Sequence, residues 1–276
     1  MKKIILTDDE INKIIELYNS GLGQTKIKNI TNISNNLIIR TLKENNIDII
    51  GTKRFSCDEN FFDKIDTEEK SYWLGFLFAD GYVRIRKDKY GELKLKLQYR
   101  DINHIELFKN HINSNNVIKT VDEKYKYKGE IKTTKSSTFS IYSTKIVNDL
   151  INLGCTENKS KTIIFPDDLP KELIRHFIRG FFDGDGCVSL YKDRIDLYIC
   201  CANKEFLTSI KTIFTQIGIT KQEITLNINN VYLLRFYRYN DMKRIYDYFY
   251  TDSTVFLTRK MDTFNNVNKK IENKYE

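Results

Sequence analysis

The chain has 276 residues and a mass of 32.7 kDa, which allows one large domain or two smaller ones. Its 45 Lys and Arg residues outnumber 37 Asp and Glu residues, so the net charge is +8. This balance favours a polyanionic partner such as nucleic acid over an acidic metabolite, although many basic surfaces are only solvated. Five cysteines without a C-x-x-C pair, three scattered histidines and no G-x-S-x-G motif disfavour a disulfide scaffold, a histidine-based nuclease and a serine triad.

The cysteine usage is that of a reducing compartment, so a cytoplasmic, intracellular location is expected. The start of the chain, MKKIILTDDE, reaches acidic residues before an apolar stretch of useful length. No run approaches the roughly 18 apolar residues that a membrane span needs. We therefore expect neither a signal peptide nor a membrane partner.

Residues 1–46 have the pattern of three short helices. Thr7 and Glu10 form a capping-box pattern before a helical run that Gly21 and Gly23 stop; a second helix covers 24–30, and Ser34 is the expected N-cap of a third. The third helix turns Leu37, Ile38, Thr41 and Leu42 inward and leaves polar candidates for DNA contact outside: Asn35, Asn36, Arg40 and Lys43. This pattern predicts a helix-turn-helix domain, with a plain three-helix bundle as the alternative. Residues 47–60 are expected to be a linker.

From Tyr72 onward the chain presents the same order of elements twice. Each copy has an apolar helix ending in Asp-Gly, two strands, a helix, two strands, a helix and a lysine-bearing segment. We therefore predict two pseudo-symmetric α+β half-domains, residues 61–170 and 171–276, related by a pseudo-dyad.

The two apolar helices carry small residues at four-residue spacing, Gly75 with Ala79 and Gly180 with Gly184. Such residues let helix backbones approach closely, so the helices should pack together with Gly81 and Gly186 as C′ caps. This packing places Asp80 and Asp185 in adjacent last turns, where the helix dipole and mutual repulsion both disfavour carboxylates. A divalent cation reverses both penalties, and oxygen ligands suit Mg²⁺. One Asp-Gly helix end alone is an ordinary turn signal; two in equivalent places are not.

Residues 92–100, ELKLKLQYR, alternate strictly between apolar and polar side chains. The apolar face is Leu93, Leu95, Leu97 and Tyr99, and the polar face is Glu92, Lys94, Lys96, Gln98 and Arg100. A lysine-rich strand face is often an edge guard or a solvated surface. Beside the repeat and the acid pair, we interpret it as a DNA-contacting face.

WLGFLFADG (73–81) and IRGFFDGDG (178–186) resemble the two motifs of single-chain LAGLIDADG homing endonucleases, and the resemblance covers roughly residues 60–265. The first motif departs by carrying Phe78 where the family has an earlier acid, which is not the metal-binding position. The resemblance implies two αββαββα halves with saddle-shaped antiparallel sheets, preceded here by the small all-α domain. Because no intein splicing block flanks the domain, a free-standing endonuclease is expected.

The resemblance also implies the site. Asp80 and Asp185 would hold two or more Mg²⁺ ions, with Mn²⁺ as a substitute, helped by the carbonyls of Ala79 and Gly184. Lys159 and Lys260 match the basic residues that polarise water or phosphate, and Lys161 is an alternative to Lys159. Gln98, Arg100 and Asn203 match the polar residues that position water.

Double-stranded DNA is the implied partner, bound by a monomer over a long, imperfectly palindromic site. The sheet residues that would contact it are Arg84, Arg86, Lys94, Lys96, Gln98 and Arg100 in the first half, and Arg194, Tyr198, Asn227, Arg235, Tyr237 and Arg238 in the second. The expected activity is metal-dependent hydrolysis of DNA phosphodiesters. The alternative on the same scaffold is a non-cleaving DNA-binding regulator or an RNA maturase, and a structural protein with a basic surface is the unrelated alternative.

Overall fold

The computed structural model describes residues 6–20, 22–47, 56–86, 90–157, 159, 162–191 and 194–275, without the side chains of residues 190, 191, 194 and 271–275. Gly21, Lys161, the side chain of Arg194 and most of the expected linker lie outside the described residues. Two compact units divide the chain, Met1–Phe55 and Ser56–Glu276, and each is described by itself.

The N-terminal unit consists of α1 (Asp8–Asn19), α2 (Gln24–Thr31) and α3 (Asn35–Glu44). The predicted capping box is present: Thr7 N donates to Glu10 Oε2 at 2.9 Å and Glu10 N donates to Thr7 Oγ1 at 3.3 Å. A small apolar core joins the three helices through Ile14, Ile27, Ile33, Ile38 and Leu42. The three predicted helices are confirmed, and the helix-turn-helix remains a prediction.

The larger unit repeats one order of elements. Its first half is α4 (Glu68–Asp80), β1 (Gly81–Ile85), β2 (Gly91–Gln98), the 3-10 turn η1 (Tyr99–Asp101), α5 (Ile102–His111), β3 (Lys119–Tyr127), β4 (Glu130–Tyr142) and α6 (Thr144–Asn152). Its second half is α7 (Lys171–Asp185), β5 (Gly186–Tyr191), β6 (Arg194–Cys201), α8 (Lys204–Gln216), β7 (Gln222–Leu226), β8 (Tyr232–Phe236) and α9 (Tyr239–Tyr250), followed by α10 (Thr258–Tyr275). The sheets have equivalent antiparallel orders, β1-β2-β4-β3 and β5-β6-β8-β7, so the predicted αββαββα fold is confirmed.

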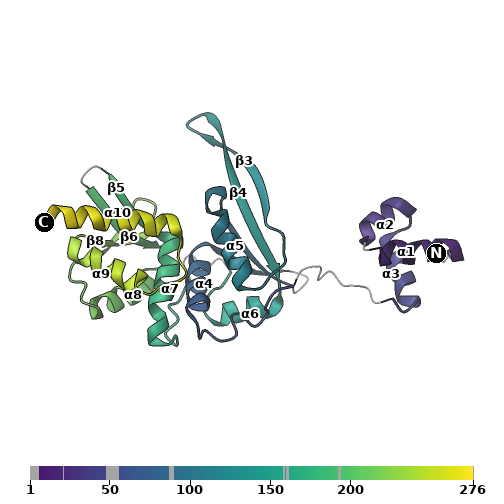
Figure 1. Cartoon of the computed structure of the whole chain (residues 1–276), viewed down its shortest axis with the longest axis horizontal. Coiled ribbons are helices and arrows are strands. Elements are labelled where there is room, and N and C mark those ends of the chain that lie inside the picture. The colour runs from purple at the N-terminus through teal and green to yellow at the C-terminus, as the bar shows by residue number, and fades with distance from the viewer. Residues whose placement is uncertain are drawn as a thin grey trace. The chain divides into compact units, whose positions relative to one another are not determined.

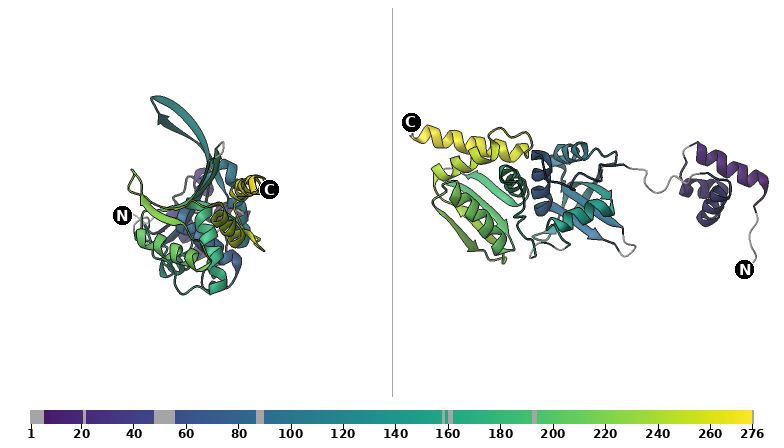
Figure 2. Two further views of the ribbon diagram at one scale, coloured as in Figure 1. Left: turned by 90° about the vertical axis from the view of Figure 1, so that its left-hand side faces the viewer. Right: turned by 90° about the horizontal axis from the view of Figure 1, so that it is seen from below.

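Helices α4 and α7 pack against each other at the centre of this unit (Figures 1 and 2). A Cβ atom on Gly75 would overlap the carbonyl oxygen of Phe177, and one on Gly180 would overlap that of Tyr72. The two contacts are related by symmetry, because Phe177 and Gly180 each lie 105 positions after Tyr72 and Gly75. Glycine at both positions therefore allows the helix backbones to touch, as the small-residue spacing predicted.

Gly81 and Gly186 do follow the helices as caps, with their backbone nitrogens donating to the carbonyl oxygens of Leu77 and Phe182, but neither has the left-handed conformation usual for a C′ glycine. Their φ angles are −74° and −89°, so both are extended and each begins a strand directly after the helix. Glycine is needed here for space, because a Cβ on Gly81 would overlap the carbonyl oxygen of Leu77 and one on Gly186 the ring of Phe182.

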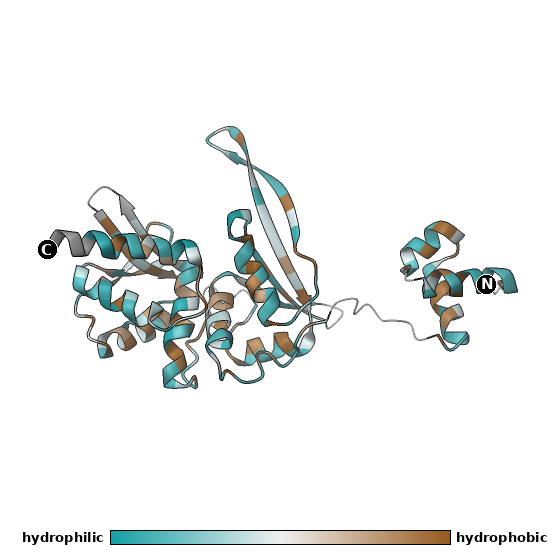
Figure 3. Cartoon of the chain, in the orientation of Figure 1, coloured by the Kyte–Doolittle hydropathy of each residue, from teal (hydrophilic) through white to brown (hydrophobic). Residues whose placement is uncertain are grey.

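The helices of each half cover one face of its sheet, where the core forms (Figure 3). Leu93 and Leu95 are buried on that face, as predicted. The predicted alternation fails at both ends of the segment: the strand ends at Gln98, so Tyr99 and Arg100 lie in the turn η1, and Tyr99 is exposed. Glu92, expected on the polar face, is buried and pairs with Lys94 at 3.2 Å.

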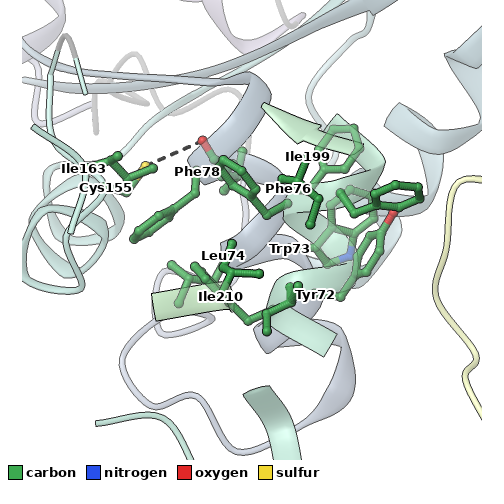
Figure 4. Packing of buried hydrophobic residues seen from close by; sticks show 14 of the residues in the cluster. Tyr72, Trp73, Leu74, Phe76, Phe78, Cys155, Ile163, Ile199 and Ile210 are labelled. Atoms are coloured by element: carbon green, nitrogen blue, oxygen red, sulfur yellow. Dashed lines mark hydrogen bonds between the residues drawn. The ribbon is translucent and has the colours of Figure 1, made fainter. Parts of the chain in front are cut away.

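The symmetry of the helix pair is broken at the contact between Tyr72 and Asp183. Tyr72 donates a hydrogen bond of 2.7 Å from its hydroxyl to Asp183 Oδ2 across the interface. The symmetry-related pair, Phe177 and Phe78, instead makes an edge-to-face ring contact with centroids 5.1 Å apart. Figure 4 shows Tyr72 and Phe78 within this aromatic cluster. One polar contact therefore corresponds to one apolar contact across the pseudo-dyad.

A buried ion pair also joins the halves. Arg179 is fully buried, and its guanidinium donates to Glu68 Oε1 at 2.6 Å and to the carbonyl oxygens of Phe249 and Val255. Glu68 Oε1 also accepts from the backbone nitrogens of Thr254 and Val255. The arginine thus ties the start of α4 to the segment before α10.

The outer hairpins of the two sheets differ in length. Strands β3 and β4 have 9 and 13 residues, whereas β7 and β8 have 5 each. The longer hairpin extends away from the other elements of its unit as a two-stranded ribbon (Figure 1). Among the described residues, no helix combines the length and apolarity that crossing a bilayer requires.

Candidate metal and nucleic-acid site

Asp80 and Asp185 end α4 and α7 side by side. Gly184 packs against Ala79, and a Cβ on Gly184 would lie 3.3 Å from Asp80 Oδ2. In the part of the chain that the structure describes, neither carboxylate makes a hydrogen bond or a salt bridge. The helix packing therefore brings together two acids to which no described residue donates a hydrogen bond or an ion pair.

Their surroundings oppose ionisation. Burial of its carboxyl group, and then the charge of Asp80, raise the pKa of Asp185 to about 6. Although Asp80 as a residue is exposed, crowding of its carboxyl group by protein atoms raises its pKa too, against the opposing charges of Lys260 and Lys159. The helix dipole adds to this cost because both acids sit at helix C-termini.

The donor set at the helix ends fits a hard divalent cation. It offers two carboxylates, with the carbonyl oxygens of Ala79 and Gly184 beside them on the same helices. No cluster of three or more His, Cys, Asp or Glu side chains suited to a metal occurs among the described residues. Mg²⁺ commonly uses only one or two protein carboxylates and completes its shell with water and substrate phosphate. The residues present therefore fit Mg²⁺ and do not form a closed structural metal site.

Lys260 lies at the end of α7. Its ammonium donates to the carbonyl oxygens of Phe182 at 2.7 Å, Gly186 at 2.5 Å and Gly184 at 3.3 Å. The lysine is buried, and desolvation lowers its pKa. An ammonium group has three protons, so Lys260 is engaged mainly in capping a helix C-terminus. Gly184, expected to help hold the metal through its carbonyl, shares that oxygen with this lysine.

Lys159 has the corresponding place in the first half, where its ammonium donates to the carbonyl oxygen of Gly81 at the end of α4. Lys159 comes from the loop after α6, and among the described residues its ammonium contacts one carbonyl oxygen. Lys260 comes from α10 and contacts three. The two lysines predicted from the repeat therefore do reach the two acidic helix ends, with different degrees of enclosure.

Three residues near the acids were not predicted from the sequence. Arg259 Nε donates to both carboxylate oxygens of Asp101, at 2.9 and 3.0 Å, and so links α10 to the first half. Cys200 Sγ donates to the carbonyl oxygen of Asp185 at 2.8 Å. An arginine next to a lysine and an acid after a strand carry no sequence signal of their own, because only the fold brings them together.

The three residues expected to position water lie in different settings. Gln98 is exposed at the end of β2, and Arg100 follows it in η1 with its Nε 3.9 Å from Asp101 Oδ2. Asn203 is the N-cap of α8: its Oδ1 accepts from Phe206 N at 3.1 Å, and its Nδ2 donates to the carbonyl oxygen of Ile163. This geometry gives Asn203 a clear structural role.

The uncovered face of the first sheet carries most of the predicted DNA-contacting side chains. Lys94 lies 5.1 Å from the ring centre of Tyr82. Lys96 pairs with Glu123 at 2.5 Å, and Arg84 lies 3.9 Å from Glu157. Arg86 follows the end of β1, and its backbone nitrogen donates to the carbonyl of Tyr90. These acid contacts are exposed and exchangeable, so they do not prevent binding to phosphate.

The second sheet presents a less charged face. Arg235 lies over the ring of Tyr198, 4.9 Å from its centre, on paired positions of β8 and β6. Asn227 is committed to a turn, since its Oδ1 accepts from Asn229 N and Val231 N. Tyr237 is exposed beyond β8, and Arg238 donates to Thr220 Oγ1 at 2.9 Å at the edge of the sheet.

The predicted contact residues of the N-terminal unit lie on α3. Asn36 and Lys43 are exposed, Asn35 and Arg40 are partly buried, and Arg40 pairs with Glu44 at 3.6 Å. The unit therefore offers a small polar helix face.

Parts of this sequence and its fold are similar to known proteins. Residues 172–250 match the family model of the LAGLIDADG-like domain. The solved structure of the homing endonuclease I-WcaI bound to its DNA recognition sequence is similar, with a TM-score of 0.50 and 15% identity, covering 74% of this chain and 91% of that one. At this identity the likeness shows a shared fold and nothing more.

Curated relatives match over parts of the chain. The probable translation initiation factor IF-2 of Methanocaldococcus jannaschii is 29% identical over 154 residues, which are 55% of this chain. An uncharacterized protein of the same organism is 26% identical over 215 residues, covering 75% of this chain and 70% of the relative. The chain spans only 12% of the length of the initiation factor and 12% of an RNA polymerase subunit of that organism.

Proposed function

We propose that this chain, which carries a LAGLIDADG-like domain on the fold of single-chain LAGLIDADG endonucleases, is a metal-dependent endonuclease for double-stranded DNA. The observation that carries the proposal is the pair Asp80 and Asp185. They are adjacent at two helix ends, their pKa values are raised, and neither carboxylate has a hydrogen-bonded or ion-paired partner among the described residues. A protein that only bound nucleic acid would gain nothing from two such acids.

Asp80 and Asp185 would hold Mg²⁺, with Mn²⁺ as a substitute, together with the carbonyl of Ala79. When bound, the ions supply Lewis acidity toward phosphate and a more acidic water. The reaction adds one water to a phosphodiester: a bond forms between the water oxygen and phosphorus, one ester oxygen leaves, and that oxygen takes up a proton. No oxidant or reductant is needed.

The lysines assist the reaction by holding the helix ends. By donating to the carbonyls around Asp185, Lys260 fixes the direction of that carboxylate and offsets the negative end of α7. Lys159 does the same for Asp80 with less enclosure, which leaves its ammonium more available to a scissile phosphate. The pair of Arg259 and Asp101 sits beside the acids and joins the two halves there.

The two sheets would bind the duplex through their uncovered faces. Lysines and arginines on the first sheet suit phosphate oxygens, while Gln98 and Arg235 are of the types that read base edges. The faces differ in charge, which suits a long site that is not a perfect palindrome. We expect one protein molecule per site, because both acids are on one chain.

The test is incubation of the full chain with a randomised library of double-stranded DNA in Mg²⁺ or Ca²⁺, followed by sequencing of cut ends. Cuts at one long site with Mg²⁺ only, lost in Asp80→Asn and in Asp185→Asn while binding persists, are expected. The matched control is Asp168→Asn, an exposed acid of the loop before α7. Retention of one sequence without cuts in either metal would overturn the nuclease and favour a regulator; retention of RNA instead would favour a maturase.

A further inference from the structure

We infer that residues 122–135 of the β3–β4 ribbon, here termed the arm, hold duplex DNA beyond the first sheet by contacting phosphates, without reading its sequence. This inference rests on the proposed DNA-binding function and assigns the arm a task of its own. It follows from the position, the composition and the unpaired charges of the arm.

The arm begins where the sheet narrows to two strands. Pairing of β2 with β4 ends at Gln98 and Ser136, whereas β3 and β4 continue to pair from Asp122 and Lys135 to Tyr127 and Glu130. Six paired residues at about 3.3 Å each extend the ribbon by roughly 20 Å. Both views in which it is seen lengthwise show it curving away from the helices (Figures 1 and 2).

The arm buries almost nothing of its own. The side chains of β3 are exposed along nearly its whole length, and Ile131 of β4 is 74% exposed. Two-stranded hairpins without a core are only marginally stable in water. An extension of this length is therefore expected to be stabilised by binding to another molecule. Figure 3 shows the arm as mostly hydrophilic, which disfavours an apolar protein surface as that partner.

The charges of the arm point to a polyanion. It contains five lysines against three acids: Lys124, Lys126, Lys128, Lys132 and Lys135 against Asp122, Glu123 and Glu130. Within the described residues none of these lysines forms an ion pair with an acid, while Glu123 is taken by Lys96. Lys132 instead lies 4.7 Å from the ring centre of Tyr127, and Lys135 lies 4.0 Å from that of Tyr99. Aromatic rings hold these ammonium groups without neutralising them.

The residue types of the arm suit phosphate and not base edges. Bidentate recognition of bases uses Arg, Asn and Gln, and residues 122–135 contain none of them. Lysine is a point charge that contacts phosphate at any sequence. The equivalent hairpin of the second half, residues 222–236, is short and has one Glu, one Arg and no Lys. An edge-strand guard would also use lysine, but it requires no added length.

The geometry gives a quantitative expectation. A ribbon about 20 Å long, laid along a duplex that rises about 3.4 Å per base pair, covers roughly six base pairs. We expect the bound site to be longer on the side of the first half by about that amount, and the added part to tolerate any sequence.

The experiment uses the full chain with the triple substitution Lys124→Gln, Lys126→Gln and Lys132→Gln. The control carries Lys64→Gln, Lys171→Gln and Lys204→Gln, which are exposed lysines away from the acidic helix ends. Duplex binding in Ca²⁺ is measured at several salt concentrations, and the protected length is measured by hydroxyl-radical footprinting. Neither readout requires cleavage.

The arm variant should lower the slope of log affinity against log salt by about 2 to 3, since each phosphate contact contributes roughly 0.9. Its footprint should retract by about half a turn on one side, with unchanged base preferences; the control should match the unaltered chain. An unchanged slope and footprint would contradict the inference that the arm contacts phosphates. A loss of base preference at the end of the site next to the first half would contradict the inference that the arm does not read sequence. If the chain binds duplex DNA with the expected slope and footprint but never cuts it, the nuclease proposal fails while the inference about the arm holds.

Discussion

The carboxyl group of Asp185 has a pKa of about 6 because protein atoms replace its water and Asp80 lies nearby. Its unfolded value is the ordinary 3.8, so the folded state holds the proton more tightly. This acid therefore costs stability as pH rises from about 4 to 6, and the full cost persists above 6. At about 1.36 kcal/mol per pKa unit, that cost is at most about 3 kcal/mol.

Asp185→Asn should consequently abolish cleavage and stabilise the fold at pH 8 by about 1 to 3 kcal/mol. Urea unfolding at pH 8 and at pH 4 measures this, and the gain should shrink at pH 4, where the native acid is protonated. Asp168→Asn should change neither quantity. A loss of stability at pH 8 would contradict the placement of Asp185.

Cleavage should also depend on pH through the same acids. A metal binds the ionised carboxylates, so the rate should rise with pH through about 6 and then level off. Because metal and protons compete, more Mg²⁺ should move the midpoint to lower pH. Single-turnover cleavage measured at two Mg²⁺ concentrations tests this, and a midpoint that ignores the metal concentration would argue against metal binding by these acids.

Asp183 lies two positions before Asp185 and is fully buried. Its Oδ2 accepts from Tyr72 and from Leu257 N, both at 2.7 Å, and so ties α7 to α4 and to the start of α10. Asp183→Leu should destabilise the fold by about 2 to 5 kcal/mol, because it leaves the N–H of Leu257 buried without an acceptor and removes the carboxylate to which Tyr72 donates. Asp183→Asn retains an acceptor and should cost less. Denaturant midpoints of the two variants give the order, and equal losses would contradict it.

At the scale of elements, the contact of α4 with α7 decides where the acids lie. Glycine in the middle of a helix is normally inferior to alanine by about 1 kcal/mol. Gly75→Ala and Gly180→Ala should nevertheless destabilise the fold by 3 kcal/mol or more, or prevent folding, since each Cβ would overlap a carbonyl oxygen of the facing helix. Thermal unfolding compares them with Ser209→Ala on α8, which should be nearly neutral. A stabilising alanine at either glycine would contradict the packing.

The sequence allowed this helix pair, its acids and both half-domains to be predicted, because small-residue spacing and hydrophobic period are local signals. The ends of the strands could not be predicted. In the sequence, Tyr99 continues the apolar–polar alternation of β2, but in the structure the strand ends at Gln98 and the chain turns there. The unequal hairpins were also missed. Beyond the sheet both faces of β3 and β4 are largely exposed, so the alternation of Lys and Tyr over residues 124–128 marks no buried face and does not show where the strands end.

Within the site, the acids and lysines were predicted through the repeat, whereas Arg259, Asp101 and Cys200 were not. These three gain their place from contacts between elements far apart in the chain, such as Arg259 with Asp101. The role of the glycines after the acids was misjudged for a related reason. Glycine is needed at position 81 because a Cβ there would overlap Leu77, and the sequence does not distinguish this need for space from the need for a left-handed helix cap.

At the scale of the whole molecule, we expect the polar face of α3 in the N-terminal unit to contact duplex DNA in addition to the two sheets. Asn36→Ala with Lys43→Ala should weaken duplex binding about 5- to 50-fold while leaving the cut positions unchanged, because the acids lie in the other unit. Binding titrations and mapping of cut ends test this, with Lys13→Ala on α1 as the control. Shifted cut positions would contradict the division of tasks.

The broken symmetry at Tyr72 and Asp183 restricts how the two halves could have arisen and be recombined. A homodimer of two second halves would face each Asp183 with Phe177, which has no hydroxyl, so each buried acid would lose the Tyr72 donor and keep the backbone N–H of Leu257. A homodimer of two first halves would face each Tyr72 with Phe78, so the hydroxyl would lose its carboxylate acceptor and keep His104 Nε2 at 2.9 Å. If the halves descend from a duplicated gene, their divergence has made them complementary at this contact. A transplanted half keeps the hydrogen bond between the helices only if it meets the matching residue at position 72 or 183.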